Sequence, residues 1–297
     1  MKKPTLVLLA AGMGSRFGGL KQLSPVGPEG QPIIEYSLYD AARAGFGEVV
    51  LVIKREMADE VEQALLRRAR GRIACRTVFQ SLDMLPEGLR VPDGRKKPWG
   101  TGHAAWCARD AVDRPFGVIN ADDFYGLDAF ELLAGFLSAV DSLRKMCLIS
   151  YAIENTLSDS GPVRRGVCEV KDGVLKSVTE RDKIAREAGG IFYEENGEKH
   201  GIPTGTPISM STWGLSPQIF GYIERDLRGI IANAADPLEC ECKLTSAVDD
   251  MIRLGMAEIT AIPTTAGWHG VTYQQDKPAV RAALAGMHRN GIYPALR

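Results

Sequence analysis

The stretch LLAAGMGSRFGGLKQLSP, residues 8–25, decides how the fold begins. A nearly continuous apolar run over residues 5–11 stops at Gly12, and more glycines follow at once, together with Arg16 and Lys21. Such a run predicts a strand that is covered on both faces of a parallel sheet. A strand that ends in a Gly-rich turn can present backbone N–H groups to phosphate. The turn therefore predicts a phosphate site; a tight turn with solvated cations is the alternative.

Two common phosphate-binding loops are excluded by the spacing of this turn. The pattern GxGxxG fails because Phe17 stands at the position of its third glycine. The pattern GxxxxGK[ST] fails because Leu20 separates Gly19 from Lys21. The turn must therefore be of another type.

Strand and helix patterns alternate through the first half of the chain. This alternation predicts a doubly wound, mainly parallel sheet, which binds ligands beyond the carboxyl ends of its strands. The stretch 81–100 is rich in proline, glycine and charge, which predicts an exposed, mobile loop of the kind that binds ligands or closes over them. Strands are expected at residues 5–11, 48–54, 76–80, 116–120 and 146–153, and helices at 33–44, 58–70, 103–112 and 128–142.

From about residue 160 the pattern changes to one typical of antiparallel strands. Two short apolar runs flank Asp172-Gly173, which predicts a hairpin. We expect a single domain over residues 1–297, made of two halves, 1–150 and 151–275, and a C-terminal helical segment, 276–297. Strands are expected at 167–170, 174–180, 207–215 and 257–264, and helices at 217–232, 245–254 and 276–289.

Composition limits the classes of partner. The 297 residues carry a net charge of −1, which predicts no general attraction to nucleic acid or to a membrane surface. The N-terminal apolar run is far shorter than the roughly 20 residues that cross a bilayer. The six cysteines contain no CxxC pair, and without a secretory leader they indicate reduced thiols in the cytoplasm. A zinc site at Cys240 and Cys242 is not favoured, because the usual ligand spacing is absent.

The N-terminal stretch resembles the signature of the sugar-1-phosphate nucleotidylyltransferases, LAAGxGxR followed by a lysine and a Pro-Val segment. The resemblance implies a Rossmann-like, mixed sheet and a reaction in which an NTP and a sugar 1-phosphate give an NDP-sugar and pyrophosphate. Several negative charges crowd together in that reaction, so positioning and charge neutralisation dominate. By resemblance, Arg16 binds the leaving pyrophosphate and Lys21 the α-phosphate, and the nucleotide lies against Ala10, Ala11, Gly12 and Gly14.

Further parts of the nucleotide and metal sites follow from the same resemblance. Gln80 corresponds to a glutamine that reads the base, and Gly100 and Thr101 to a following Gly-Thr-Ala turn, although Gly102 here replaces the alanine. The resemblance assigns Asp122 to Mg²⁺, with Asp123 as the alternative or as a second ligand; Mg²⁺ prefers a few carboxylate oxygens together with substrate phosphate.

The second half resembles the sugar-binding half of the family. Gly166 would lie against the sugar and Glu180 would accept hydrogen bonds from its hydroxyls, with Ser209 where the family usually has an asparagine. Arg181 stands at the position where the family has a lysine after that glutamate. We expect Lys183 to take over the role of the family lysine.

One departure from the family pattern concerns the metal. Gly270 stands where a second metal-binding aspartate is usual. Two alternatives therefore stay open: transfer to a non-sugar acceptor such as phosphocholine or a cofactor precursor, and a protein that binds the nucleotide without catalysis. The expected partners are an NTP and a sugar 1-phosphate, with no nucleic acid and no membrane; whether the chain forms a homo-oligomer, and which base and sugar it takes, is not predicted.

Overall fold

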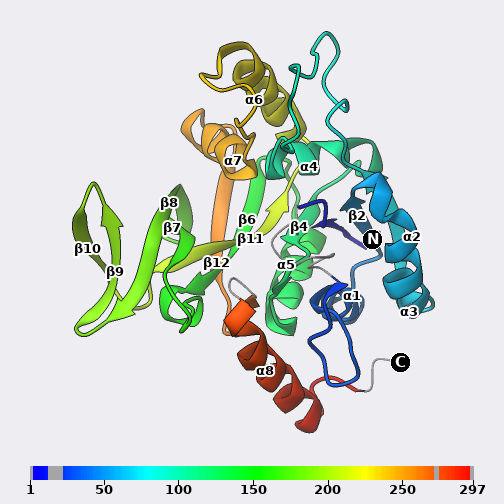
Figure 1. The fold of residues 1–297 in the computed structure, drawn as a ribbon, viewed down its shortest axis with the longest axis vertical. Coiled ribbons are helices and arrows are strands. Elements are labelled where there is room, and N and C mark those ends of the chain that lie inside the picture. The colour runs from blue at the N-terminus through cyan, green and yellow to red at the C-terminus, as the bar shows by residue number, and fades with distance from the viewer. Residues whose placement is uncertain (1–2, 13–22, 271–273, 295–297) are drawn as a thin grey trace.

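The computed structural model describes residues 3–12, 23–270 and 274–294. Their main element is a large twisted sheet with helices packed on both faces, so the predicted α/β class is confirmed (Figure 1). Along this sheet the strands follow the order β10-β9-β8-β12-β6-β11-β4-β1-β2-β3, and β7 pairs with β11 and β8.

The first half supplies the parallel part of the sheet. β1 (Thr5–Leu9) pairs in parallel with both β2 (Glu48–Ile53) and β4 (Phe116–Asn120), and β3 (Ala74–Phe79) extends β2. The apolar run that predicts a doubly covered strand is buried as expected, with Leu6, Val7 and Leu8 fully inaccessible. The carboxyl ends of these strands therefore lie along one edge, where the predicted site residues follow them.

The helices form two layers. Alternate side chains of β1 enter two different cores: Leu6 packs with α1 and α5 on one face, and Val7 packs with α4, α6 and α7 on the other. The helix expected at residues 58–70 is continuous over residues 58–69, but its middle, Glu62–Leu66, is π-helical and divides it into α2 and α3. The helices are α1 (Ile33–Ala44), α2 (Ala58–Val61), α3 (Arg67–Ala69), α4 (Thr101–Cys107), α5 (Leu127–Ala139), α6 (Ile219–Asn233), α7 (Leu244–Arg253) and α8 (Lys277–Arg289).

The second half adds mostly antiparallel strands. β11 lies between β4 and β6 and runs antiparallel to both, whereas β12 is parallel to β6. Two short strands, β5 and β13, form a separate ribbon. The strands that follow β4 in the chain are β5 (Asp123–Phe124), β6 (Lys145–Ala152), β7 (Val163–Lys171), β8 (Val174–Glu187), β9 (Gly190–Glu195), β10 (Glu198–Ile202), β11 (Pro207–Leu215), β12 (Glu258–Pro263) and β13 (His269–Gly270).

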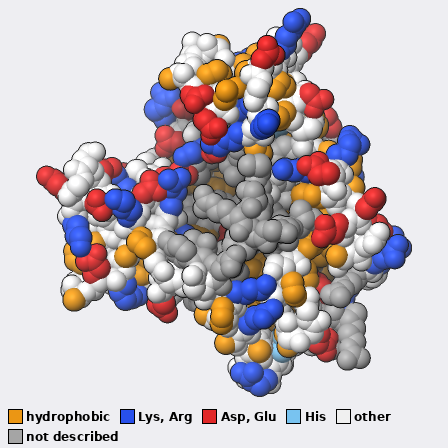
Figure 2. All heavy atoms as spheres, viewed as in Figure 1, with side chains coloured by type: hydrophobic (Ala, Val, Ile, Leu, Met, Phe, Trp, Pro, Cys, Tyr) orange, Lys and Arg blue, Asp and Glu red, His pale blue; other side chains and the backbone are white. Residues whose placement is uncertain are grey.

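The strands β8, β9 and β10 form an arm that projects at the left of Figure 1. No strand was expected between residues 180 and 207, but β9 and β10 form a hairpin there, closed by Asn196 and Gly197, both with positive φ. Figure 2 shows acidic and basic side chains mixed over this arm. Among the described residues, no helix is both long and apolar enough to cross a membrane.

Helix α8 packs against α1 through an aromatic cluster. Tyr36 is hydrogen-bonded to His288 at 2.8 Å, and Tyr293 donates a 2.6 Å hydrogen bond to the carboxylate of Asp40. Asp40 is buried, and this burial raises its pKa to about 7.

Candidate active site

The first site residues lie where β1 ends. Ala10 and Ala11 are buried, and the Ala10 N–H donates to the carbonyl of Val52 at 2.8 Å, which continues the sheet pairing up to the turn. Gly12 follows directly, at the carboxyl edge of the sheet. The other residues predicted in this turn, Gly14, Arg16 and Lys21, lie outside the described residues.

Gln80 follows β3 and lines a cavity of about 230 Å³ together with Trp99 and His103. Its amide nitrogen donates to the carbonyl of Gly100 at 3.3 Å and to Nδ1 of His103 at 2.9 Å. The structure therefore brings Gln80 and Gly100 together, although twenty residues separate them in the sequence.

His103 fixes the orientation of this amide. Its Nε2 lies 2.5 Å from the carbonyl oxygen of Met84, which can only accept, so Nε2 carries the proton and Nδ1 accepts from Gln80. Burial lowers the pKa of His103, which keeps the ring neutral. Both N–H groups of the Gln80 amide are then occupied by the protein, and only its oxygen is left for a ligand.

The turn before α4 packs closely against a segment more than a hundred residues away. Gly100 has φ +98°, and a Cβ added there would lie 2.6 Å from the carbonyl oxygen of Cys242. The Gly102 N–H donates to the same oxygen at 2.9 Å, and a Cβ at Gly102 would lie 2.8 Å from the Cys242 sulfur. This contact explains why glycine replaces the alanine of the family pattern at 102. Thr101 accepts a hydrogen bond from the N–H of Leu244 through Oγ1 at 3.1 Å.

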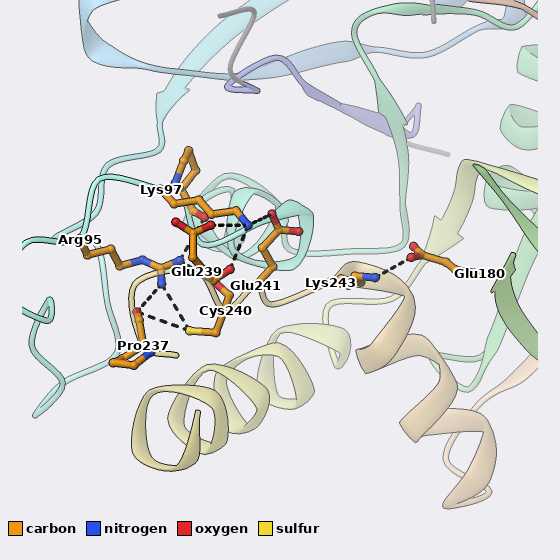
Figure 3. A network of polar contacts seen from close by, with 9 residues as sticks. Arg95, Lys97, Glu180, Pro237, Glu239, Cys240, Glu241 and Lys243 are labelled. Atoms are coloured by element: carbon orange, nitrogen blue, oxygen red, sulfur yellow. Dashed lines mark hydrogen bonds and ion pairs between the residues drawn. The ribbon is translucent and has the colours of Figure 1, made fainter. Parts of the chain in front are cut away.

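The loop 81–100 is held against the segment that precedes α7 (Figure 3). Arg95 is 5% exposed, stacks on Trp99 at 3.5 Å, and donates to the carbonyls of Pro237 and Cys240 at 2.6 and 2.7 Å. The expectation of an exposed loop is therefore wrong for Arg95 and Trp99, which are buried. Lys97 joins the same contact by pairing with Glu239 and Glu241 at 3.2 and 3.0 Å.

Three residues predicted to bind the sugar lie side by side on neighbouring strands. In the register of the sheet, Gly166 of β7 is opposite Glu180 of β8 on one side and opposite Ser209 of β11 on the other. Directly opposed residues point to the same face, so a carboxylate and a hydroxyl flank a position without a side chain. We call these three residues the acceptor floor. A Cβ at Gly166 would lie 2.9 Å from the side chain of Val178. A residue other than glycine at position 166 would therefore collide with Val178.

The cations near the acceptor floor differ from those expected. Arg181 pairs with Glu195 of β9 and Lys183 pairs with Glu194 of β9, at 3.0 Å in the second case. Neither contact is with Glu180. Lys243, just before α7, makes that contact instead, with Nζ at 2.5 Å from Oε2 of Glu180. The sequence patterns gave Lys243 no role, because they did not connect the segment before α7 with the hairpin.

The two predicted carboxylates follow β4. Asp122 lies in the turn, and Asp123 starts β5, where it accepts hydrogen bonds of 3.3 Å from the side chains of Asn120 and Tyr125. Asp123 is paired with Gly270 across the β5–β13 ribbon. A Cβ at Gly270 would lie 2.9 Å from the Asp123 carboxylate and 2.3 Å from the Trp268 ring.

An aspartate at position 270 therefore has no room while Trp268 keeps this place. Within residues 3–12, 23–270 and 274–294, no group of three or more His, Cys, Asp or Glu side chains could hold a metal ion. A cation at this edge would have to depend on Asp122, Asp123 and oxygens of the ligand, a set that suits Mg²⁺.

The known proteins similar to this chain are named as nucleotidyltransferases. A family model described as MobA-like NTP transferase domain matches residues 6–84. The UTP–glucose-1-phosphate uridylyltransferase of Bacillus subtilis (strain 168) is 29% identical over 253 residues, which cover 77% of this chain and 76% of that protein. UTP–glucose-1-phosphate uridylyltransferase 2 of Staphylococcus saprophyticus is 24% identical over 264 residues, 83% of this chain and 80% of that protein.

The matched domain, these relatives and the solved structures with this fold support a sugar-1-phosphate nucleotidylyltransferase family for the chain. The predicted family and the predicted enzyme class, a nucleotidyltransferase, are confirmed. Solved structures with the same fold include the UTP-bound UGPase from Acinetobacter baumannii, with a TM-score of 0.61, 17% identity, and coverage of 98% of this chain and 99% of that one. The inositol-1-phosphate CTP transferase from T. maritima has a TM-score of 0.64 at 11% identity and 97% coverage of both chains. The nucleotidylyltransferase thus has the predicted nucleotide-diphospho-sugar transferase fold.

Proposed function

We propose that this enzyme transfers the uridylyl group of UTP to glucose 1-phosphate and releases pyrophosphate. Two relatives that cover most of the chain carry the name of this activity. The observation that supports the choice of base is the fixed amide of Gln80, whose two N–H groups are occupied by His103 and Gly100.

An amide that offers only its oxygen favours a base with a ring N–H at that edge, which uracil, thymine and guanine carry and cytosine and adenine lack. Uracil and thymine carry such an N–H between two carbonyl groups, whereas cytosine and adenine have an unprotonated ring nitrogen at the corresponding edge. Placing that nitrogen against the Gln80 oxygen would bury two acceptors without a proton between them. Leaving buried polar groups unpaired costs about 1–3 kcal/mol, which corresponds to roughly a hundredfold discrimination at the upper end.

The remaining residues fit the transfer step. An oxygen of the sugar phosphate attacks the α-phosphorus of UTP in line with the departing pyrophosphate, and the protein has to position these anions and neutralise their charge. We assign neutralisation to Arg16 and Lys21, and the sugar hydroxyls to the acceptor floor. Mg²⁺ held by Asp122, with Asp123 beside it, would neutralise phosphate charge when bound. Six free cysteines fit the reducing cytoplasm as its place of action.

Pyrophosphate release with glucose 1-phosphate and Mg²⁺ tests the proposal. UTP and dTTP should support turnover, and CTP and ATP should give values of kcat/KM about a hundredfold lower. Gln80→Ala should reduce the difference between UTP and CTP to a few-fold, whereas the exposed Gln218→Ala should preserve it. Equal use of CTP and UTP by the wild-type enzyme would show that the Gln80 argument is wrong.

A second panel tests the acceptor. With UTP constant, glucose 1-phosphate should be preferred over other sugar 1-phosphates, phosphocholine and inositol phosphate. Turnover with a non-sugar phosphate but with no sugar 1-phosphate would replace the proposed acceptor.

A further inference from the structure

Lys243 contacts the acceptor floor from a distant part of the chain. Figure 3 shows its side chain extended toward Glu180, and the ammonium lies 2.5 Å from Oε2 of that residue. The two side chains are 42% and 36% exposed, so both can meet a ligand from solution. The contact joins the start of α7 to β8, which lie 63 residues apart in the sequence.

The backbone on both sides of Lys243 is fixed to the nucleotide side of the molecule. The N–H of Cys242 donates to the carbonyl of Trp99 at 2.6 Å, and the N–H of Leu244 donates to Oγ1 of Thr101 at 3.1 Å. These two partners flank Gly100, whose carbonyl accepts from Gln80. The position of Lys243 is therefore set by the same turn that orients the base-reading amide.

The basic side chains of β8 itself are directed to other partners. Arg181 pairs with Glu195 and lies over the Tyr193 ring, and Lys183 pairs with Glu194. Among the contacts that the structure describes, Lys243 is thus the cation bonded to Glu180.

We propose that Lys243 is a positioning residue for the acceptor sugar. Its ammonium holds Oε2 of Glu180, so that Oε1 is presented to sugar hydroxyls lying over Gly166. A carboxylate has enough lone pairs to accept from Lys243 and from the sugar at the same time. The inference deepens the proposed function and rests on it.

The expected effect follows from preorganisation. A glutamate side chain that is already ordered loses less rotamer freedom when a ligand binds, and the cost of ordering one such side chain corresponds to roughly a two- to tenfold change in affinity. Because Lys243 acts on the sugar and not on the reacting phosphorus, KM for glucose 1-phosphate should change while kcat stays nearly constant.

The experiment compares Lys243→Met with Lys243→Arg and with the matched control Lys97→Met. Lys97 is a neighbouring cation that pairs with Glu239 and Glu241 and not with Glu180. At saturating UTP, Lys243→Met should raise KM for glucose 1-phosphate about fivefold, with kcat and KM for UTP within twofold. Lys243→Arg should restore KM to within twofold, and Lys97→Met should leave it unchanged.

A double-mutant cycle with Glu180→Gln separates positioning from direct contact. If Lys243 acts through Glu180, its replacement should add less than twofold to KM in the Glu180→Gln enzyme. The inference would be overturned if Lys243→Met left KM for glucose 1-phosphate unchanged, or if Lys97→Met raised it equally. It would also be overturned if the KM increases of Lys243→Met and Glu180→Gln multiplied fully in the double variant.

A binding measurement keeps this inference distinct from the proposed function. Calorimetric titration with UDP-glucose should show about fivefold weaker binding by Lys243→Met than by the wild-type enzyme. Equal affinities with an active wild type would overturn the role of Lys243 alone. An inactive wild type that does not bind UDP-glucose would refute the proposed function and this inference with it.

Discussion

Replacing Gly100 by alanine should destabilise the enzyme strongly. Gly100 has φ +98°, a region that residues with a Cβ rarely adopt, and the added Cβ would lie 2.6 Å from the carbonyl oxygen of Cys242. The backbone strain costs about 1–3 kcal/mol, and displacing a packed backbone costs about 1–3 kcal/mol more. We therefore expect the free energy of unfolding to fall by about 4 kcal/mol.

Gly94→Ala is the matched control for this change. Gly94 lies in the same loop with φ +82°, but a Cβ there would meet no atom within 4 Å. Only the conformational cost remains, about 1 kcal/mol. The difference between the two variants, about 3 kcal/mol, combines the close contact between Gly100 and Cys242 with the greater backbone strain at Gly100, where ψ is −175°.

Urea unfolding followed by circular dichroism measures both variants. KM for UTP gives a second readout, because a shift of the Gly100 carbonyl removes a hydrogen-bond partner of Gln80. We expect KM for UTP to rise in Gly100→Ala and to stay near the wild-type value in Gly94→Ala. If the two variants lose equal stability, the reasoning about the Cys242 contact is refuted.

Three further predictions concern other parts of the molecule. Arg95→Met should lower the free energy of unfolding by about 2–4 kcal/mol in urea titrations. The reason is that three backbone carbonyls lose a charged donor and the stacking on Trp99 is lost. A loss below about 1 kcal/mol would show that these buried contacts of Arg95 do not stabilise the fold. The pKa of Asp40 is about 7 in the folded enzyme, above its unfolded value of about 3.9, so the folded state binds more protons between these values. Stability should therefore fall as pH rises from about 4 to about 7, and Asp40→Asn should flatten this part of the unfolding profile; a slope that persists in the variant would exclude Asp40 as its cause. Lys21→Ala and Asp122→Asn should each lower kcat by at least about a hundredfold in the pyrophosphate assay without lowering the melting temperature, and wild-type rates would show that these assignments are wrong.

Regular hydrophobic patterns predicted the main elements of the fold well. The expected bounds of α1, β4 and β11 agree with the structure, because each has a sustained apolar pattern that ends at a glycine or a polar turn. The hairpin of β9 and β10 was missed because its strands are short and each buries a single side chain, Ile191 in β9 and Ile202 in β10. Its Asn-Gly turn was the available indication.

The candidate site was predictable where a local motif carries it. Gln80, Gly166 and Glu180 follow from short motifs, and the structure places them beside a cavity or next to one another. The contacts of Lys243 and Arg95 were not predictable, because they join segments more than 60 residues apart and such pairs leave no periodic pattern in the sequence.

The position of β11 limits how the enzyme can admit its substrates. Its end at residues 213–215 is paired with β4, and its start at residues 207–209 is paired with β6 and with β7. The acceptor floor therefore lies on β11 itself and on the strands β7 and β8 beside it. Swinging one half away from the other would break this ladder, at about 0.5–1.5 kcal/mol for each hydrogen bond. Entry and exit of substrates must therefore rely on rearranged loops and side chains above a rigid platform, and crystals of the enzyme should tolerate soaking with nucleotide sugars.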